Sequence, residues 1–127
     1  MRYVLESKKT PASAVEDLRA AASKHGFGVL HAYDLKETLT SKGFPLAHAC
    51  HILEVCNPQQ ASKVLAEDMG MNIALPCRIS VYEENGQTKI ATALPTKLLS
   101  ALSDSAALAA VAQDVETKIK AIIHDAA

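Results

Sequence analysis

The alternation of hydrophobic and polar positions predicts five β-strands. Runs in which every second side chain is apolar are typical of strands with one buried face. The run over 47–55 carries apolar residues on both faces, so we expect this strand near the centre of a sheet. The predicted strands lie at residues 3–7, 27–34, 47–55, 77–82 and 89–94.

Apolar residues three and four positions apart predict four helices. A threonine, aspartate or asparagine that can act as N-cap precedes three of them, and in two of these a proline takes the first helical position. The predicted helices cover 11–25, 35–42 and 58–70, and a last one carries the stripe Leu108, Val111, Val115, Ile119 and Ile122. We expect residues 72–76 to form a loop or a last helical turn, and the segment of Leu98 and Leu99 to lead through a serine-rich connection to the last helix.

The pair Asn85-Gly86 between the last two strands is the strongest short hairpin signal in the chain. Both residues tolerate the positive φ angles that a type I′ turn requires. A turn at this position predicts three cross-strand pairs: Val81 with Ile90, Ile79 with Thr92, and Cys77 with Leu94. Pro95 should end the last strand because proline cannot donate a ladder hydrogen bond.

The order of these elements predicts a single α+β domain over residues 1–127. We expect a mostly antiparallel sheet with helices packed on one face, in β-α-β(4)-α order, with short helices inserted after the second and third strands. The length is usual for one domain. Many alanines and no tryptophan make the core thin, which favours a homodimer.

Charge and cysteine content narrow the class of protein. A net charge of −1 argues against a nucleic-acid binder with a basic face. No apolar run approaches the roughly 18 residues of a membrane span, and the N-terminus does not have the pattern of a signal peptide. Three cysteines, an odd number, argue against a secreted disulfide framework. We therefore expect a cytoplasmic protein with free thiols.

Cys56 is the first candidate for chemistry because it lies between a predicted strand and the helix that Asn57 caps. A thiol that faces the free N–H groups of a helix N-terminus has a lowered pKa and forms the reactive thiolate more readily. The alternative is a small buried side chain behind the strand, since free cysteine is among the most buried residue types.

Cys77 begins the next strand and could approach Cys56 if the two strands are antiparallel neighbours. A disulfide between them would require Cα atoms within about 7 Å. Two separate core cysteines are an equally good interpretation. Glu54 lies in the apolar third strand and needs a partner there, for which Arg78 across the sheet is the candidate.

A weaker hypothesis is a metal site. His48, Cys50, Glu54 and Cys56 would share one strand face by their spacing of two, but this spacing matches no known zinc signature. We interpret Met69 and Met71 as core residues.

Three segments, ILEVCNP, LPCRISVYEENG and ALPTKLL, resemble the domain-of-unknown-function 302 family, and the resemblance extends over residues 1 to about 124. Its most specific parts are Cys56-Asn57-Pro58, Leu75-Pro76-Cys77 and Pro95-Thr96. The resemblance implies a small α+β domain with strand–helix–four-strand–helix topology that forms dimers. It implies no established activity, and only a loose association with sulfur metabolism.

Three hypotheses about function follow. The leading one is a small thiol protein that binds or carries a sulfur species or another small ligand near Cys56 and Cys77, with Glu54 and Arg78 tuning the site and Asn57 fixing the helix start. The second is a non-catalytic metal- or ligand-binding module in the same cleft. The third is a structural or interaction protein whose cysteines belong to the core.

Overall fold

Five antiparallel strands form one sheet in the order β1-β5-β4-β3-β2. The structure is a computed structural model that describes all residues from 1 to 127. The strands are β1 (Arg2–Ser7), β2 (Gly28–Asp34), β3 (Cys50–Cys56), β4 (Cys77–Glu84) and β5 (Gln87–Ala93). Two predictions about β3 are confirmed: it is an inner strand of the sheet, and its neighbours β2 and β4 both run antiparallel to it.

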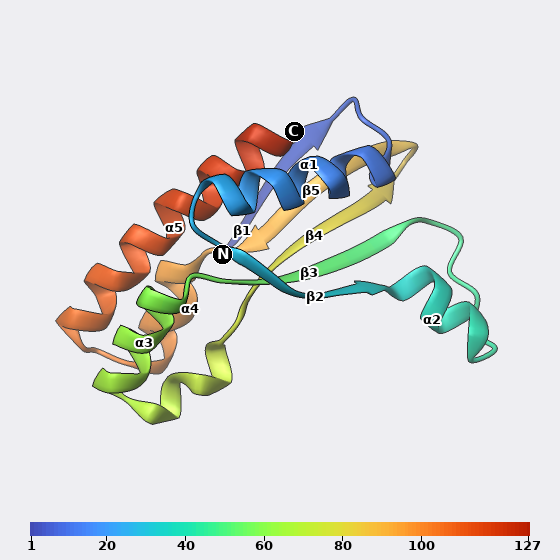
Figure 1. Cartoon of the computed structure of the whole chain (residues 1–127). Coiled ribbons are helices and arrows are strands. Elements are labelled where there is room, and N and C mark those ends of the chain that lie inside the picture. The colour runs from blue at the N-terminus through green and yellow to red at the C-terminus, as the bar shows by residue number, and fades with distance from the viewer.

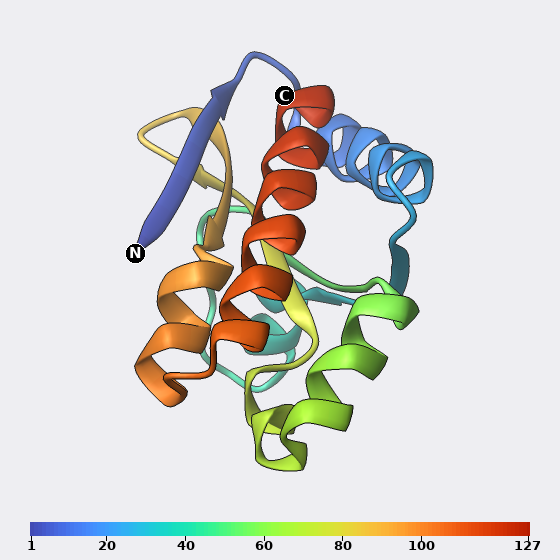
Figure 2. The ribbon, with the colours of Figure 1, turned by 90° about the vertical axis from the view of Figure 1, so that its left-hand side faces the viewer.

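Two long helices cover one face of this sheet, and the shorter helices lie at its ends (Figures 1 and 2). The helices are α1 (Pro11–Lys24), α2 (Leu35–Ser41), α3 (Pro58–Glu67), the 3-10 helix η1 (Met69–Ala74), α4 (Pro95–Leu102) and α5 (Ala106–Ala126). Helices α1 and α5 pack side by side, while α3, η1 and α4 gather at the end of the sheet opposite α2. The α+β class is confirmed and the predicted elements occur in the predicted order, whereas η1 and α4 are additional helices.

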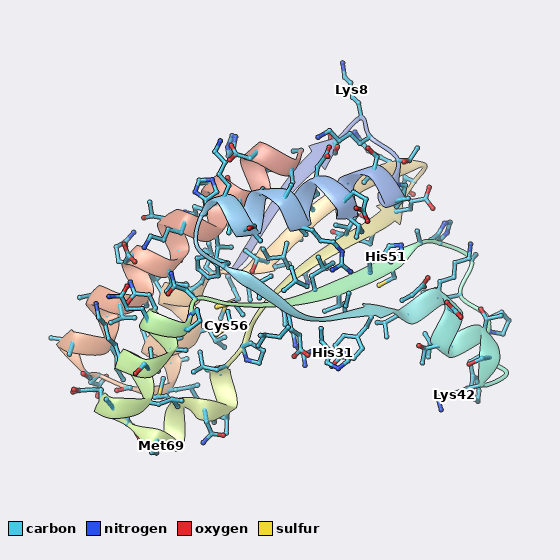
Figure 3. All side chains as sticks on the ribbon, in the orientation of Figure 1. Lys8, His31, Lys42, His51, Cys56 and Met69 are labelled. Carbon is cyan, nitrogen blue, oxygen red and sulfur yellow. The ribbon has the colours of Figure 1, made fainter.

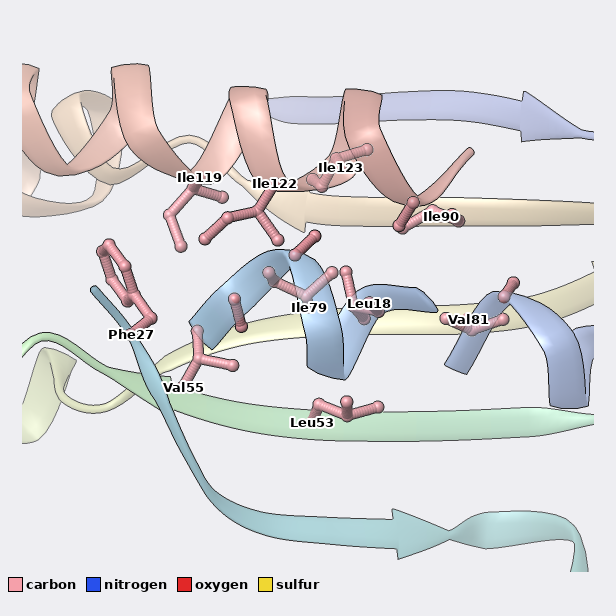
Figure 4. Close-up of a cluster of buried hydrophobic side chains, with 14 of the residues drawn as sticks. Leu18, Phe27, Leu53, Val55, Ile79, Val81, Ile90, Ile119, Ile122 and Ile123 are labelled. Carbon is pink, nitrogen blue, oxygen red and sulfur yellow. The ribbon is translucent and has the colours of Figure 1, made fainter. Parts of the chain in front are cut away.

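The main core lies between the sheet and the helices α1 and α5. Strand alternation sends Leu53 and Val55 of β3 to the helix side, where they meet Ile79 and Val81 of β4 and the side chains Ile119 and Ile122 of α5 (Figure 4). All six are fully buried. The alternate residues of the same strands therefore point to the opposite face, which no helix covers.

A second, smaller core holds the end of the sheet together. Val64 of α3, Met71 of η1, Leu99 of α4, and Leu108 and Ala112 of α5 form this cluster. Met71 is thus a core residue, as predicted, whereas Met69 is 66% exposed and the prediction for it is wrong. This cluster joins α3, η1 and α4 to α5, and it borders the cavity described below.

The predicted hairpin turn is confirmed, and so are two of the three predicted cross-strand pairs. Asn85 and Gly86 have φ angles of 54° and 75°, and Val81 pairs with Ile90 and Ile79 with Thr92. The expected pair of Cys77 and Leu94 does not form in the ladder. The strand ends at Ala93, and the Leu94 N–H donates instead to the carbonyl of Met1, 2.7 Å away.

Helix α4 occupies the segment that the sequence assigned to a connection. Its N-cap residue, Leu94, has no side chain that can accept a hydrogen bond. The carboxylate of Glu116 on α5 supplies the missing acceptor: Oε1 accepts from the Thr96 backbone N–H at 3.1 Å and from the Thr96 hydroxyl at 2.7 Å. Because this cap comes from 20 residues away, a local sequence pattern does not reveal it.

The boundaries around β3 and α3 also differ from the prediction. Strand β3 begins at Cys50 rather than at residue 47, and the exposed His48 lies in a bend before it. Helix α3 ends at Glu67 rather than at Gly70 because Asp68 adopts an extended conformation. The Asp68 carboxylate then accepts from the Gly70 N–H at 2.9 Å and caps η1, which extends to Ala74 where the sequence allowed either a loop or a last turn. None of the helices combines the length and apolar composition that a membrane crossing requires.

Candidate ligand-binding pocket

An apolar pocket of about 250 Å³ lies at the end of the sheet where β3 leads into α3. Its walls come from the start of β2, the end of β3, α3, the segment before β4, α4 and α5. Thirteen of its 17 lining residues are hydrophobic. The lining comprises Phe27, Leu30, Val55, Cys56, Asn57, Gln60, Ala61, Val64, Leu65, Leu75, Pro76, Cys77, Pro95, Leu99, Val111, Ala112 and Val115. No lysine, arginine or carboxylate takes part, so the pocket suits an uncharged ligand.

Two of the three cysteines contribute to this wall. Antiparallel pairing places Cys77 directly opposite Val55, so Cys77 at the start of β4 lies beside the end of β3. Figure 3 shows Cys56 at that end of β3, next to α3. Burial raises the pKa of the Cys77 thiol to about 11, and the nearby Cys56 adds to this increase. All three cysteines are free, and the structure contains no disulfide between these two.

The expectation that the helix start lowers the pKa of Cys56 is wrong. Burial raises the pKa of this thiol above its ordinary value. The helix start offers few free donors: Pro58 has no N–H, and the side chain of Asn57 already accepts from the Gln60 N–H at 3.2 Å. Asn57 therefore fixes the helix start as predicted, but in doing so it competes with any thiolate at Cys56.

Gln60 is a polar side chain in the pocket wall that was not among the site residues predicted from the sequence. Its Nε2 donates to Oδ2 of Asp114 on α5, and its Oε1 is buried without a hydrogen-bond partner. No other buried side-chain oxygen or nitrogen in the protein lacks a partner. The sequence does contain one signal for Gln60, since a glutamine three residues after the N-cap Asn57 is typical of a helix start. This local pattern does not show where the side-chain oxygen points.

Glu54 and Arg78 pair as predicted, but outside this pocket. They are direct neighbours in the β3–β4 ladder on the uncovered sheet face, with Arg78 Nη2 3.6 Å from Glu54 Oε2. The Tyr33 hydroxyl donates to Glu54 Oε1 at 2.7 Å, and this hydrogen bond raises the pKa of Tyr33. The rings of His31 and Tyr33 stack with centroids 5.0 Å apart. Because none of these residues lines the pocket, they form a separate polar cluster.

The metal hypothesis finds no support in the arrangement of side chains. No group of three or more histidine, cysteine, aspartate or glutamate side chains is placed to hold an ion. His48 is exposed before the strand rather than on its face. Cys50 is at the far end of β3 from Cys56, and its pKa is raised by burial and by the charge of Asp34.

Comparisons with known proteins agree with this fold. Residues 3–126 match the family model described as "Domain of unknown function DUF302". The chain is also similar to a solved structure, that of an uncharacterized conserved DUF302 protein from Bacillus stearothermophilus. The two share 35% sequence identity with a TM-score of 0.94, over 99% of this chain and 98% of the other. No curated protein matches the chain.

Proposed function

This chain belongs to the DUF302 family, whose description names no activity, and we propose from its own geometry that it binds a small apolar ligand in the pocket beside Cys56 and Cys77. The observation that carries the proposal is the pocket itself: about 250 Å³, almost wholly apolar, with two thiols in one wall. A cavity of about 150 Å³ with such a lining is enough to bind benzene in another protein.

The thiols support binding rather than nucleophilic catalysis. Their pKa values lie above the ordinary value because burial disfavours the charged form. At neutral pH both side chains are therefore protonated and act as soft, weakly polar parts of the wall. Free thiols also accord with the cytoplasmic location that the cysteine content suggests.

A second candidate uses the same wall to carry sulfur. The observation that favours sulfur transfer is that two free thiols, Cys56 and Cys77, line one cavity. Cys56 would accept the outer sulfur of a small persulfide, RSSH, and release the thiol RSH, so that one S–S bond breaks and one forms. Mass spectrometry of the native protein after incubation with a persulfide would show Cys56 heavier by one sulfur atom. An unchanged mass would remove this candidate.

Assembly as a homodimer, and folding of residues 1–127 as one domain, are further parts of the proposal. The sheet face opposite α1 and α5 is bare, and it exposes Val4 and Tyr33, each about two-fifths accessible. A second copy that covers this face would remove apolar surface from water. A single cooperative unfolding transition would support one domain.

The ligand proposal is tested with N-phenyl-1-naphthylamine, an uncharged probe whose fluorescence rises in apolar surroundings. We expect saturable binding to the wild type. Ala61→Leu fills the pocket from α3 and should weaken binding at least about tenfold, a change of roughly 1.4 kcal/mol. Ala66→Leu is the matched control, because Ala66 is exposed on the same helix and does not line this pocket.

Circular dichroism would establish that both variants are folded. Equal probe affinity in the wild type and in both variants would mean that the probe binds elsewhere. Absence of saturable binding to the wild type would overturn the proposed function.

A further inference from the structure

The orientation of the Gln60 side chain is fixed by its neighbours on α5. Asp114 lies in contact with both Gln60 Nε2 and Lys118 Nζ, the latter at 3.0 Å. Hydrogen bonds from Lys118 and Gln60 hold the pKa of Asp114 below its ordinary value, so this carboxyl group is ionised at neutral pH. An ionised carboxylate can only accept hydrogen bonds. The amide nitrogen of Gln60 must therefore face Asp114, and the amide cannot flip to hide its oxygen there.

In this orientation the amide oxygen of Gln60 has no hydrogen-bond partner within the protein. Gln60 Oε1 is buried, and it is the one buried side-chain polar atom in the molecule that receives no hydrogen bond. A buried acceptor without a donor is unfavourable, and native proteins rarely keep one unless something else satisfies it. Gln60 also belongs to the pocket wall. In the empty pocket this oxygen is closed to water, and a small movement of the side chain on binding would bring it against the donor of a bound molecule.

The remainder of the wall sets the other properties of that molecule. The only other lining residue with a side-chain nitrogen or oxygen is Asn57, whose oxygen already accepts from the Gln60 N–H. No basic side chain lines the pocket, so a carboxylate, sulfate or phosphate would enter without an ionic partner. The chemistry that fits is an apolar body with one neutral donor.

We infer that the ligand of this pocket is a small, uncharged, mostly apolar molecule whose single hydroxyl or N–H group donates a hydrogen bond to Oε1 of Gln60. This inference rests on the proposed function and deepens it, because it assigns Gln60 as the residue that determines specificity. It also explains why a glutamine, rather than an apolar residue, stands in an otherwise apolar wall.

The test compares two probes of nearly the same shape, indole and benzothiophene, of which only indole carries an N–H donor. Each is titrated against wild-type protein loaded with N-phenyl-1-naphthylamine, and displacement of the fluorescent probe is measured. We expect indole to displace it at a concentration at least about tenfold lower than benzothiophene. In Gln60→Met, which keeps the length of the side chain but removes the acceptor, the two probes should displace equally.

The outcomes separate this inference from the function on which it rests. Equal displacement by both probes from the wild type would overturn the role of Gln60 while leaving the pocket as a ligand site. A preference for indole that persists in Gln60→Met would overturn it as well. No saturable binding of the fluorescent probe would overturn the proposed function and this inference together. The wild-type comparison needs no variant, so the result does not depend on the folding of Gln60→Met.

Discussion

At the scale of single residues, the environment of each cysteine decides its chemistry. Cys56 and Cys77 occupy one pocket wall, and Cys50 lies at the other end of β3. Burial raises the pKa of all three thiols, and that of Cys77 most clearly, to about 11. The thiolate is the nucleophile in alkylation, so a raised pKa means a slower reaction at neutral pH.

We therefore predict slow alkylation of Cys56 by iodoacetamide at pH 7, slower than that of glutathione, with Cys77 the least reactive of the three. The rates should rise as the pH increases through the raised pKa values, because the thiolate fraction grows. Mass spectrometry of the digested protein would give the rate at each cysteine. Saturation with N-phenyl-1-naphthylamine should protect Cys56 and Cys77 but leave Cys50, the internal control, unchanged. Labelling of Cys56 faster than glutathione would restore the activated-thiolate hypothesis.

The Tyr33–Glu54 pair gives a second residue-scale prediction. The hydrogen bond to Glu54 is the main cause of the raised pKa of Tyr33, followed by burial and the charge of Glu54, while Arg78 acts in the opposite direction. Glu54→Gln should lower the pKa of Tyr33 towards its ordinary value, and Arg78→Ala should raise it further. Phenolate absorbance as a function of pH would measure both.

The chain contains three tyrosines and no tryptophan, so the phenolate signal is readily resolved. Tyr33→Phe identifies which transition belongs to Tyr33. An unchanged transition in Glu54→Gln would show that the hydrogen bond does not form in solution.

At the scale of elements, α4 depends on a contact with α5. Glu116 is 7% exposed, caps α4 through Thr96 and pairs with Lys120, whose Nζ lies 3.6 Å from Glu116 Oε2. Burial by itself would raise the pKa of Glu116, but the hydrogen bonds from Thr96 and the charge of Lys120 outweigh it and lower the pKa. The ionised form is therefore the one that stabilises the folded protein.

We predict that Glu116→Ala lowers the free energy of unfolding by about 2 kcal/mol, the usual range for loss of a helix cap and its charge-assisted hydrogen bonds. The folded pKa lies below the unfolded value of about 4.3, so this stabilisation is present above that pH and is lost as the pH falls through the folded pKa. Urea denaturation at several pH values would measure it.

Glu16→Ala is the control for this experiment, because Glu16 is exposed on α1 and takes part in no ion pair or side-chain hydrogen bond. It should change stability by less than about 0.5 kcal/mol. A loss in Glu116→Ala that is the same at acidic and neutral pH would contradict the role of the ionised carboxylate.

At the scale of the whole molecule, the sheet has one covered and one uncovered face. Helices α1 and α5 bury the first, while the second carries Val4, Ile52 and Tyr33 among the charged residues Arg2 and Arg78. His31 lies on this second face and His51 on the first, as Figure 3 shows. An apolar, partly charged sheet face of this kind is suited to a partner that covers it.

We predict that light scattering at micromolar concentration reports about twice the chain mass of 13.5 kDa. Ile52→Lys, which places a charge at the centre of the uncovered face, should give the monomer mass without a change in the circular dichroism spectrum. Lys36→Ile, a change at an exposed position of α2 outside the sheet, is expected to leave the mass unchanged. A wild-type monomer at every concentration would exclude the homodimer.

The sequence by itself determined the features that depend on neighbouring residues. Asn85-Gly86 fixed the hairpin and its register because the turn requires positive φ angles. Thr10, Asp34 and Asn57 cap the helices where predicted, since a cap acts within three residues. The pairing of Glu54 with Arg78 could also be predicted from the sequence, because antiparallel β3 and β4 bring those positions together.

Only the tertiary structure decided the features that join distant parts of the chain. Helix α4 begins where Glu116 can reach it, although Leu94 offers no cap. The pKa of Cys56 is raised rather than lowered because burial, which depends on the packing of several elements, outweighs a helix start already occupied by Asn57. The pocket draws its wall from residues between positions 27 and 115, and the unpaired oxygen of Gln60 exists only because Asp114 holds the other end of the amide. A local pattern contains none of these long-range contacts.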